Sequence, residues 1–226
     1  MTILYFCCMK AFLFDLNGTM INDMGYHLDA WHYMINNDLG GSLDRDAVKK
    51  EMYGKNEELL VRVFGEGRFS PAQMAEISME KEKRYQQVYL PHLQLIAGLP
   101  QFLENARQQG IPMAIGSAAI NFNIDFVLDN LHIRDYFKAI VSAESVRLSK
   151  PHPETYLMAA RLLDVPPASC IVFEDAPKGV EAAANAGMQS VVLTTMHARE
   201  EFAAYNNIIA FADDYTSPEI ARLLSI

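Results

Sequence analysis

The sequence predicts an α/β fold, a doubly wound (Rossmann-like) parallel sheet core with an inserted α-helical cap domain. Short apolar runs alternate with helical patterns over most of the 226 residues, the order expected when strands are joined by crossover helices. The alternation stops once, where helical patterns follow one another without a convincing strand. We therefore expect two domains: an α/β core of residues 1–21 and 94–226, and a helical cap of residues 22–93.

The six expected strands are short, apolar at consecutive positions and bounded by polar residues or glycine, as parallel strands buried on both faces usually are. They are Ala11–Phe14, Ile111–Ile115, Ala139–Val141, Cys170–Phe173, Ser190–Leu193 and Ile208–Phe211. The helices expected between them are Leu99–Gln109, Asn121–Asn130, Pro153–Leu163, Lys178–Ala186 and Ala198–Tyr205. Those expected in the cap are His27–Asn37, Arg45–Met52, Glu57–Phe64 and Pro71–Tyr89. Because ligands bind at the carboxyl ends of strands in such sheets, a cap inserted after the first strand should cover the site.

The composition indicates a globular protein with a substantial core and disfavours two classes of partner. Half of the residues are hydrophobic and 21% are charged, which is ordinary for such proteins. A formal net charge of -9 makes a nucleic-acid backbone or an anionic membrane an unfavourable partner. No apolar run approaches the roughly 18 residues of a membrane span.

The cysteines and the first residues bear on the location of the protein. Cys7, Cys8 and Cys170 are too few for a disulfide framework, which favours a reducing, cytoplasmic location. Residues 1–8 lack the basic start and the small-residue cleavage site of a secretion signal. The first strand starts well at Met9, so we interpret residues 1–8 as an extension or a misassigned start.

Four polar motifs stand directly after predicted strands, and parallel strands share their carboxyl edge. Asp15, Ser117, Lys150 and the pair Glu174-Asp175 should therefore meet there. A carboxylate can accept a phosphoryl group, a hydroxyl and an ammonium can hold its oxygens, and further carboxylates can hold Mg²⁺. Together these residue types predict a phosphoryl-transfer site for a small phosphorylated substrate.

Here the chain resembles the haloacid dehalogenase superfamily, in its beta-phosphoglucomutase-like phosphatase branch. The motifs that carry the resemblance are DLNGT at 15–19, GSA at 116–118, SKPHPE at 149–154 and FEDAPKG at 173–179. They occur in the family's order and at similar spacing, and together they span nearly the whole chain. The resemblance implies an α/β core with a helical cap inserted after the first motif, which is where the alternation of strands and helices stops. It also implies a monomer.

The resemblance implies roles for the matching residues. Asp15 corresponds to the nucleophile, Ser117 with the adjacent Ala118 to the groups that receive the phosphoryl oxygens, and Lys150 to the neutralising cation. The side chains of Asp15, Glu174 and Asp175 and the main-chain carbonyl of Asn17 correspond to the Mg²⁺ shell.

In the predicted cap, the resemblance points to substrate contacts at His27, which matches a cap histidine, and at Gly54 and Asn56.

Each of these residues also has a purely structural interpretation. Asp15 suits a turn, Ser117 suits a helix N-cap, Lys150 suits the surface, and Glu174-Asp175 suit the start of the next helix. His27 on an amphipathic helix is as compatible with packing as with substrate contact.

Two further features of the cap are read as structural. The run KEKR at 81–84 reads as a solvated helix face. Trp31, with apolar neighbours at helical spacing, reads as packing rather than as part of a ligand site.

Asn17 is the departure from the family pattern, which has an aspartate two residues after the nucleophile. That aspartate protonates the leaving oxygen and later activates water, whereas an amide cannot transfer a proton in this way. The loss of a general acid/base typically costs about 10²–10⁴-fold in rate, and it should be largest for alkyl phosphates. Three explanations stay open: an engineered Asp-to-Asn replacement, a natural member with slow or narrowed chemistry, or a binder of phosphorylated ligands without turnover.

The leading hypothesis is a Mg²⁺-dependent phosphohydrolase that acts through an aspartyl-phosphate. A sugar-phosphate mutase is the alternative enzyme, although Glu57 stands where mutases of this branch place a cation for the distal phosphate. A catalytically impaired phosphoryl-ligand binder is a third possibility. A phosphorylated signalling receiver would place its acidic pair near the first strand, whereas this pair lies at 174–175.

Overall fold

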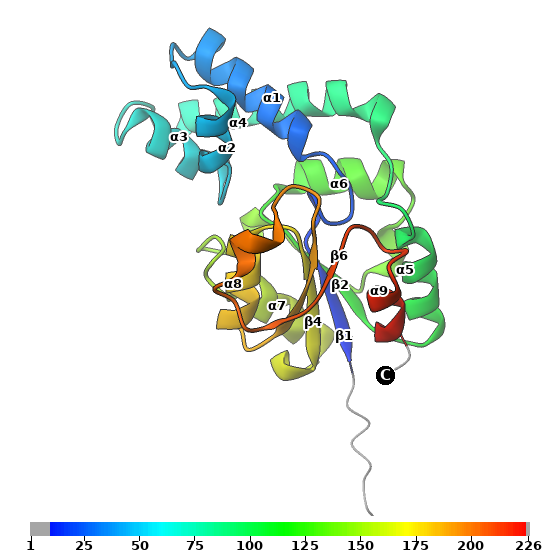
Figure 1. The fold of residues 1–226 in the computed structure, drawn as a ribbon. Helices are drawn as coiled ribbons and strands as arrows, with labels where there is room; N and C mark the ends of the chain where they lie inside the picture. The colour runs from blue at the N-terminus through cyan, green and yellow to red at the C-terminus, as the bar shows by residue number, and fades with distance from the viewer. Residues whose placement is uncertain (1–9, 225–226) are drawn as a thin grey trace, which may run out of the picture.

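A computed structural model describes residues 10–224 and shows a six-stranded parallel sheet with helices on both faces (Figure 1). The sheet has the order β3-β2-β1-β4-β5-β6. Its strands are β1 (Ala11–Phe14), β2 (Met113–Gly116), β3 (Ala139–Val141), β4 (Cys170–Glu174), β5 (Gln189–Leu193) and β6 (Ile208–Ala212). The chain builds outward from β1 on one side and then returns to β4 on the other, which makes β1 the switch point of a doubly wound sheet. The predicted fold class is confirmed.

The side chains of β1 alternate between two apolar cores, one on each face of the sheet. Phe12 and Phe14 pack into the core that includes α5 (Leu99–Gln108), α6 (Asn121–Asn130) and α9 (Pro218–Leu223). Ala11 and Leu13 pack into the core with α7 (Glu154–Leu163) and α8 (Pro177–Asn185). All four side chains are fully buried, as the continuous apolar run predicted.

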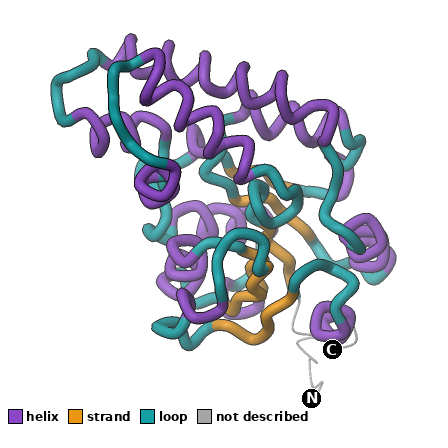
Figure 2. The backbone as a smooth tube through the Cα atoms, turned by 45° about the horizontal axis from the view of Figure 1, so that its top comes forward, coloured by secondary structure: helices purple, strands orange, loops and turns teal. Residues whose placement is uncertain are grey.

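Four helices form a layer over the carboxyl ends of the strands (Figures 1 and 2). They are α1 (Met24–Tyr33), α2 (Arg45–Glu51), α3 (Asn56–Phe64) and α4 (Pro71–Tyr89). They share an apolar cluster separate from those of the sheet, formed by Leu28, Trp31, Ile35, Val48, Leu59 and Leu60. The packing assigned to Trp31 is therefore present. The boundaries of the cap at 22 and 93 stay a prediction.

The two segments that connect this helical layer to the sheet run side by side. Ile21 forms an antiparallel bridge with Leu95, and the amide of Ile96 donates to the carbonyl of Met20 at 2.9 Å. Two paired crossings hold the helices over the sheet more firmly than two independent linkers would.

Three elements differ clearly from the sequence-based expectation, and the other predicted bounds agree with the structure to within two residues. The first cap helix begins at Met24, and its last part is a π-helix over Met34–Asp38. The helix expected at Ala198–Tyr205 is only a 3₁₀ turn, Arg199–Phe202, whose Phe202 packs into a small cluster with Val180 and Val192. Helix α9 was not expected, since its six residues are too few for a clear helical period.

The remaining short elements are 3₁₀ turns at Leu90–His92, Arg134–Tyr136, Ala143–Ser145 and Pro167–Ser169. Among residues 10–224, no helix has both the length and the apolar character needed to cross a membrane. Cys7, Cys8 and the extension proposed for residues 1–8 lie outside the described part of the chain.

Phe14 tests the central core. Its ring contacts Phe102, Phe137, Phe173 and Tyr215, with the Phe173 ring stacked at 4.7 Å. We expect Phe14→Ala to lower the free energy of unfolding by about 3–5 kcal/mol, because it removes a buried ring and leaves a cavity. Urea titration followed by circular dichroism measures the change.

Phe122→Ala is the matched control, because this ring is 39% exposed and its loss should cost well under 1 kcal/mol. Equal losses for the two variants would contradict the assignment of Phe14 to the core.

Candidate active site

Asp15 lies at the centre of the site. It is the first residue after β1 and is almost fully buried. Its amide donates to the carbonyl of Phe173 at 2.9 Å, which extends the pairing of β1 with β4. The loop then turns sharply at Gly18, whose φ is +75°. A Cβ on Gly18 would lie 2.0 Å from a carboxylate oxygen of Asp175, so the glycine also lets the two loops approach closely.

Lys150 ties the acidic groups together at the carboxyl edge of the sheet. Its Nζ donates to Asp15 Oδ1 and to Glu174 Oε1, both at 2.6 Å, and to the Tyr156 hydroxyl at 2.8 Å. The Tyr156 hydroxyl in turn donates to Glu174 Oε1 at 2.6 Å. Lys150 is 8% exposed, so the surface interpretation of this lysine is wrong.

Tyr156 was missed because it lies inside an amphipathic helix, where an aromatic residue indicates packing. Only its position six residues after Lys150, on the helix that follows the SKPHPE motif, could have pointed to it.

Glu174 and Asp175 face the same point from the end of β4 and the residue after it. The second oxygen of Glu174 accepts the amides of Asp175 and Ala176 at 3.0 and 3.1 Å, which fixes its carboxylate. Asp175 accepts the Thr19 hydroxyl at 3.3 Å, so the DLNGT turn is anchored directly to this acidic pair.

Three buried carboxylates converge here, and their chemistry fits a divalent cation. Ligand oxygens of Asp15, Glu174 and Asp175 lie within 4.8 Å of one another. Burial raises the pKa of Asp15 to about 7 although Lys150 opposes the rise, and repulsion from Glu174 adds to it. Burial, together with repulsion from Glu174 and Asp15, also raises the pKa of Asp175. One ammonium does not neutralise three buried acids, so Mg²⁺, which prefers oxygen ligands, would relieve their repulsion.

Ser117 follows β2 on the other side of Asp15 and is 1% exposed. Its amide donates to the carbonyl of Val141, and its hydroxyl accepts the amide of Ala119 at 3.1 Å. The hydroxyl proton therefore stays free to be donated to a bound group. The N-cap interpretation is not borne out, because the residue before α6 is Ile120.

The cap contributes a buried polar cluster that faces the core. Lys81 Nζ lies 2.7 Å from His27 Nδ1 and 3.0 Å from both oxygens of Glu82. Glu82 also accepts the side-chain amides of Asn56 at 2.7 Å and of Asn123, on the core helix α6, at 2.6 Å. Burial would raise the pKa of Glu82, but Lys81, His27 and the two amides hold it at about 2. The hydrogen bond from Asn123 to Glu82 thus connects the cap to the core.

This cluster corrects the interpretation of residues 81–84 as a solvated helix face for Lys81 and Glu82, whereas Lys83 is exposed. Lys81 is 2% and Glu82 3% exposed. A charge run on a long amphipathic helix carries no sign of which charges face a partner domain, so the sequence could not distinguish them.

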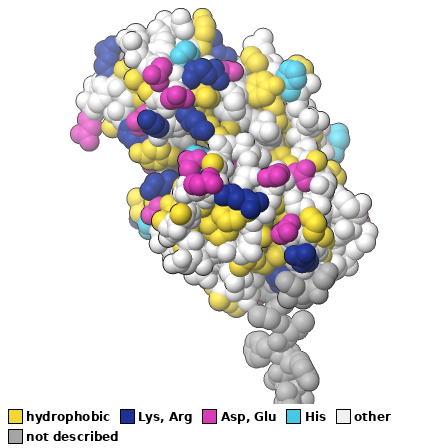
Figure 3. Space-filling view, in the orientation of Figure 1, with side chains coloured by type: hydrophobic (Ala, Val, Ile, Leu, Met, Phe, Trp, Pro, Cys, Tyr) yellow, Lys and Arg dark blue, Asp and Glu magenta, His cyan; other side chains and the backbone are white. Residues whose placement is uncertain are grey.

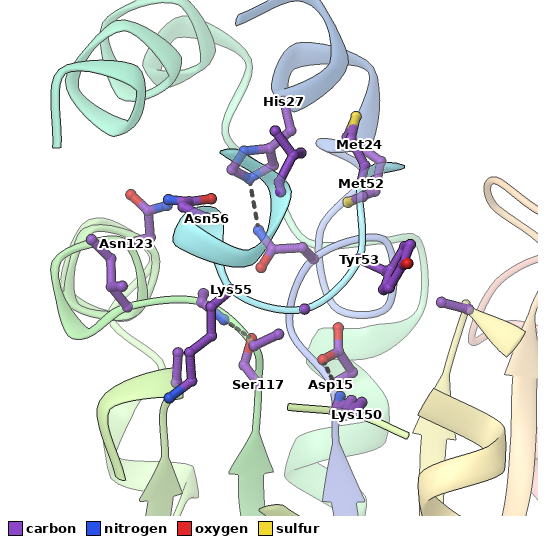
Figure 4. A pocket seen from close by; sticks show the side chains of 18 of the residues that line it. Asp15, Met24, His27, Met52, Tyr53, Lys55, Asn56, Ser117, Asn123 and Lys150 are labelled. Atoms are coloured by element: carbon purple, nitrogen blue, oxygen red, sulfur yellow. Dashed lines mark hydrogen bonds and ion pairs between the residues drawn. The ribbon is translucent and has the colours of Figure 1, made fainter. Parts of the chain in front are cut away.

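A cavity of about 650 Å³ lies between the cap and the edge of the sheet (Figure 4). The predicted site residues all line it: Asp15, Asn17, His27, Gly54, Asn56, Ser117, Ala118, Lys150, Glu174 and Asp175. Much of the cap wall is apolar, with Met24, Trp31, Met52, Leu59 and Met79. In the space-filling view, basic and acidic side chains gather where the two layers meet (Figure 3). The structure therefore brings the predicted residues together, while their individual roles stay predictions.

Asn17 points toward the cap. Its Nδ2 donates to Asp23 Oδ2 at 2.6 Å and lies 3.1 Å from His27 Nε2. The ring of His27 lies between Asn17 and Lys81 and contacts both. Packing or solvation alone therefore does not describe this histidine.

Comparison with known proteins finds similar proteins by family model and by sequence. The family model for haloacid dehalogenase-like hydrolases matches residues 9–187. The chain is 34% identical over 189 residues to beta-phosphoglucomutase of Bacillus subtilis, covering 81% of this chain and 82% of that protein. It is 28% identical to the fructose-1-phosphate phosphatase YqaB of Escherichia coli, covering 79% and 93%.

Among solved structures, a HAD hydrolase of family IA, variant 3, from Entamoeba histolytica superimposes with a TM-score of 0.84 at 25% identity. The match covers 96% of this chain and all of that one.

Metal binding can be tested by its pH dependence. In the metal-free protein the folded state holds the Asp15 proton more tightly than the unfolded chain does. Stability should therefore fall as pH rises from the ordinary pKa of 3.8 toward 7. Mg²⁺ must replace that proton, so we expect it to raise the melting temperature more at pH 8 than at pH 5. At a hundredfold excess over Kd the stabilisation should be about 2.7 kcal/mol.

Differential scanning fluorimetry at both pH values measures the effect, and Asp175→Asn, which removes one predicted ligand charge, should reduce it. An equal shift at both pH values, or one unaffected by Asp175→Asn, would place the ion elsewhere.

Proposed function

The chain belongs to the haloacid dehalogenase-like hydrolases, and from that premise we propose that it is a Mg²⁺-dependent phosphohydrolase of small phosphorylated metabolites. The observation that carries the proposal is Asp15, a buried carboxylate beside Lys150 and two further carboxylates at the floor of a capped cavity. Relatives named as a phosphoglucomutase and a sugar-phosphate phosphatase support a sugar phosphate as substrate. Asp15 would take the phosphoryl group and then pass it to water.

In the transfer step, an oxygen of Asp15 attacks phosphorus while the bond to the leaving oxygen breaks. Lys150, held at Asp15 by a 2.6 Å hydrogen bond, offsets the charge of the transferred group. The Ser117 hydroxyl, whose oxygen already accepts an amide, donates its proton to a phosphoryl oxygen. Mg²⁺, when held by Asp15, Glu174 and Asp175, supplies charge neutralisation for the approaching phosphate.

The cap would contribute orientation and exclusion of water. Lys55 Nζ donates to the carbonyl of Val146 at 2.8 Å, and Ser149, next to Lys150, donates to Glu58 at 2.8 Å. Gly54 makes this contact possible, since a Cβ there would lie 2.1 Å from Glu58 Oε2. The segment predicted to touch substrate is thereby tied to the loop that carries the catalytic lysine.

A sugar-phosphate mutase is the second candidate, because beta-phosphoglucomutase is among the relatives. A mutase must hold a distal phosphate as well as the reacting one. Glu57, at the start of α3, lines the cavity and would repel such a group. Lys81, a lining cation on the cap side, is buried in its pair with Glu82. These contacts favour hydrolysis.

Interconversion of glucose 1- and glucose 6-phosphate, followed together with phosphate release, distinguishes the two enzymes. We expect phosphate release without isomer formation. Isomer formation without phosphate release would make the chain a mutase.

A binder without turnover is the remaining alternative. The intact set of Asp15, Ser117, Lys150 and Asp175 speaks against it, because a binder has no need of a nucleophile. The predicted monomeric state and cytoplasmic location stay predictions.

The proposed nucleophile is tested by substitution. We expect Asp15→Ala to reduce hydrolysis of a panel of phosphate esters by about 10⁴-fold or more, since the covalent route is lost. Ser117→Ala should cost about 10²-fold, as the loss of one donor to the transferred group does. Phosphate release, measured with malachite green, reports both.

Asp129→Ala is the matched control, because this carboxylate is 63% exposed and pairs with Arg134 on the surface. It should retain full activity. Unchanged hydrolysis by Asp15→Ala would show that another residue is the nucleophile.

A further inference from the structure

Asp23 is a fully buried carboxylate at the point where the chain leaves the sheet and enters the cap. It is the residue before α1, and none of its surface is exposed. Its Oδ1 accepts the amide of Gly18 at 3.2 Å, and its Oδ2 accepts the Tyr85 hydroxyl at 2.5 Å and Asn17 Nδ2 at 2.6 Å. These three partners donate to Asp23, and His27 Nε2 lies 3.3 Å from the same Oδ2, so the carboxylate serves as an acceptor.

Asn17 is the partner that the catalytic loop contributes to this arrangement. An aspartate at position 17 would bring a second carboxylate oxygen to about the place of Nδ2, 2.6 Å from Asp23 Oδ2. Two ionised carboxylates in contact inside the protein repel each other, and a proton that they share to avoid this repulsion is held between them rather than given to a leaving group. The amide at position 17 is therefore matched to the carboxylate of Asp23, which lies directly before the first cap helix.

We propose that Asn17 and Asp23 are a matched amide–carboxylate pair, and that the site in consequence acts on phosphates whose leaving oxygen departs without a proton. Acyl, enol and aryl phosphates have such a leaving group. Among sugar phosphates the pair favours a phosphate on the anomeric oxygen, which is more acidic than the other hydroxyls. This inference rests on the proposed phosphohydrolase function and narrows its substrate class.

The chemistry balances without a proton donor at position 17. An oxygen of Asp15 forms a bond to phosphorus, and the leaving oxygen departs with the bonding electron pair as a carboxylate, enolate or phenolate. Water then attacks the aspartyl-phosphate, Asp15 recovers its electron pair, and the proton of water leaves with inorganic phosphate or solvent. An alkyl phosphate would have to expel an alkoxide, which is far less stable.

The cavity is compatible with such leaving groups. Its cap wall includes Trp31 and Leu59, each 2% exposed, together with the side chains of Met52 and Met79. A flat or partly apolar leaving group is well accommodated by this wall. Asp23 itself acts through Asn17 and is a positioning residue.

The first test compares leaving groups on the wild-type protein with Mg²⁺. Phenyl and p-nitrophenyl phosphate differ mainly in leaving-group acidity, and acetyl phosphate and glucose 6-phosphate extend the range in both directions. We expect kcat/KM to rise steeply with leaving-group acidity, so that acetyl and p-nitrophenyl phosphate exceed glucose 6-phosphate by about 10²-fold or more. Equal kcat/KM across the panel would overturn the proposal.

The second test exchanges the two residues. Asn17→Asp alone should lower the melting temperature by about 5 °C or more and give no large gain on glucose 6-phosphate, because its carboxylate faces Asp23. The double variant N17D/D23N reverses donor and acceptor and should recover the melting temperature. It should raise kcat/KM on glucose 6-phosphate about 10²-fold, with that on acetyl phosphate changed by less than about fivefold.

Asp23→Asn alone is the control for loss of the Asp23 charge, and its kcat/KM on glucose 6-phosphate should not rise. If Asn17→Asp alone strongly raised kcat/KM on glucose 6-phosphate and left the melting temperature unchanged, position 17 would not depend on Asp23. That result would refute the pairing.

The failure of the proposed function is distinguishable from the failure of this inference. If no phosphate in the panel is hydrolysed, or if Asp15→Ala hydrolyses them all as well as the wild type, then the phosphohydrolase assignment falls and the inference with it. If Asp15 is required but leaving-group acidity has no influence, only the inference falls.

Discussion

The hydrogen bonds from Lys150 to Asp15 and Glu174 are the constraint on which the site depends. A buried ammonium or carboxylate without a partner costs several kcal/mol, so none of these groups could be buried alone. They meet because β1 and β4 are neighbours in the sheet and both end at the same edge. The strand order thus places the proposed nucleophile beside its counter-charge before any ligand binds.

A second set of contacts links this edge to the cap and explains why the cap has a defined position. Glu82 accepts an amide from Asn123 of the core, and Asp23 accepts hydrogen bonds from Asn17 and from Tyr85 of α4. The ring of Tyr85 also stacks on His27 at 3.7 Å. The position of the cap and the orientation of Asn17 are therefore parts of one hydrogen-bonded network, and substitutions at Asp23 should affect the site.

Much of the fold follows from local patterns in the sequence. The strands Ala11–Phe14 and Ala139–Val141 and the helices Asn121–Asn130 and Pro71–Tyr89 were predicted with the bounds that the structure shows. Apolar runs with polar residues at their ends also located the edge where Asp15 and Asp175 meet. These predictions succeed because strand burial and strand-end chemistry depend on neighbours in sequence.

The polar partners of the site were harder to predict. Tyr156, Asp23 and Tyr85 hydrogen-bond with residues on other elements, and the charges at Lys81 and Glu82 are buried only because another layer covers them. Contacts such as that of Tyr85 with Asp23 join residues 62 positions apart, for which a single sequence holds no signal, and the closer ones depend on how the loops turn. The amide at position 17 looked like a lost acid until the structure placed Asp23 beside it.

The central claim is that Asp15 accepts a phosphoryl group. The most direct measurement is intact-protein mass spectrometry after brief exposure to acetyl phosphate and Mg²⁺, followed by borohydride reduction and peptide mapping. The account predicts one phosphoryl group per chain, located at Asp15 and absent from Asp15→Ala, and long-lived because Asn17 cannot activate water as a base. A phosphoryl group on Ser117 or elsewhere, or turnover of acetyl phosphate with unmodified Asp15 throughout, would contradict it.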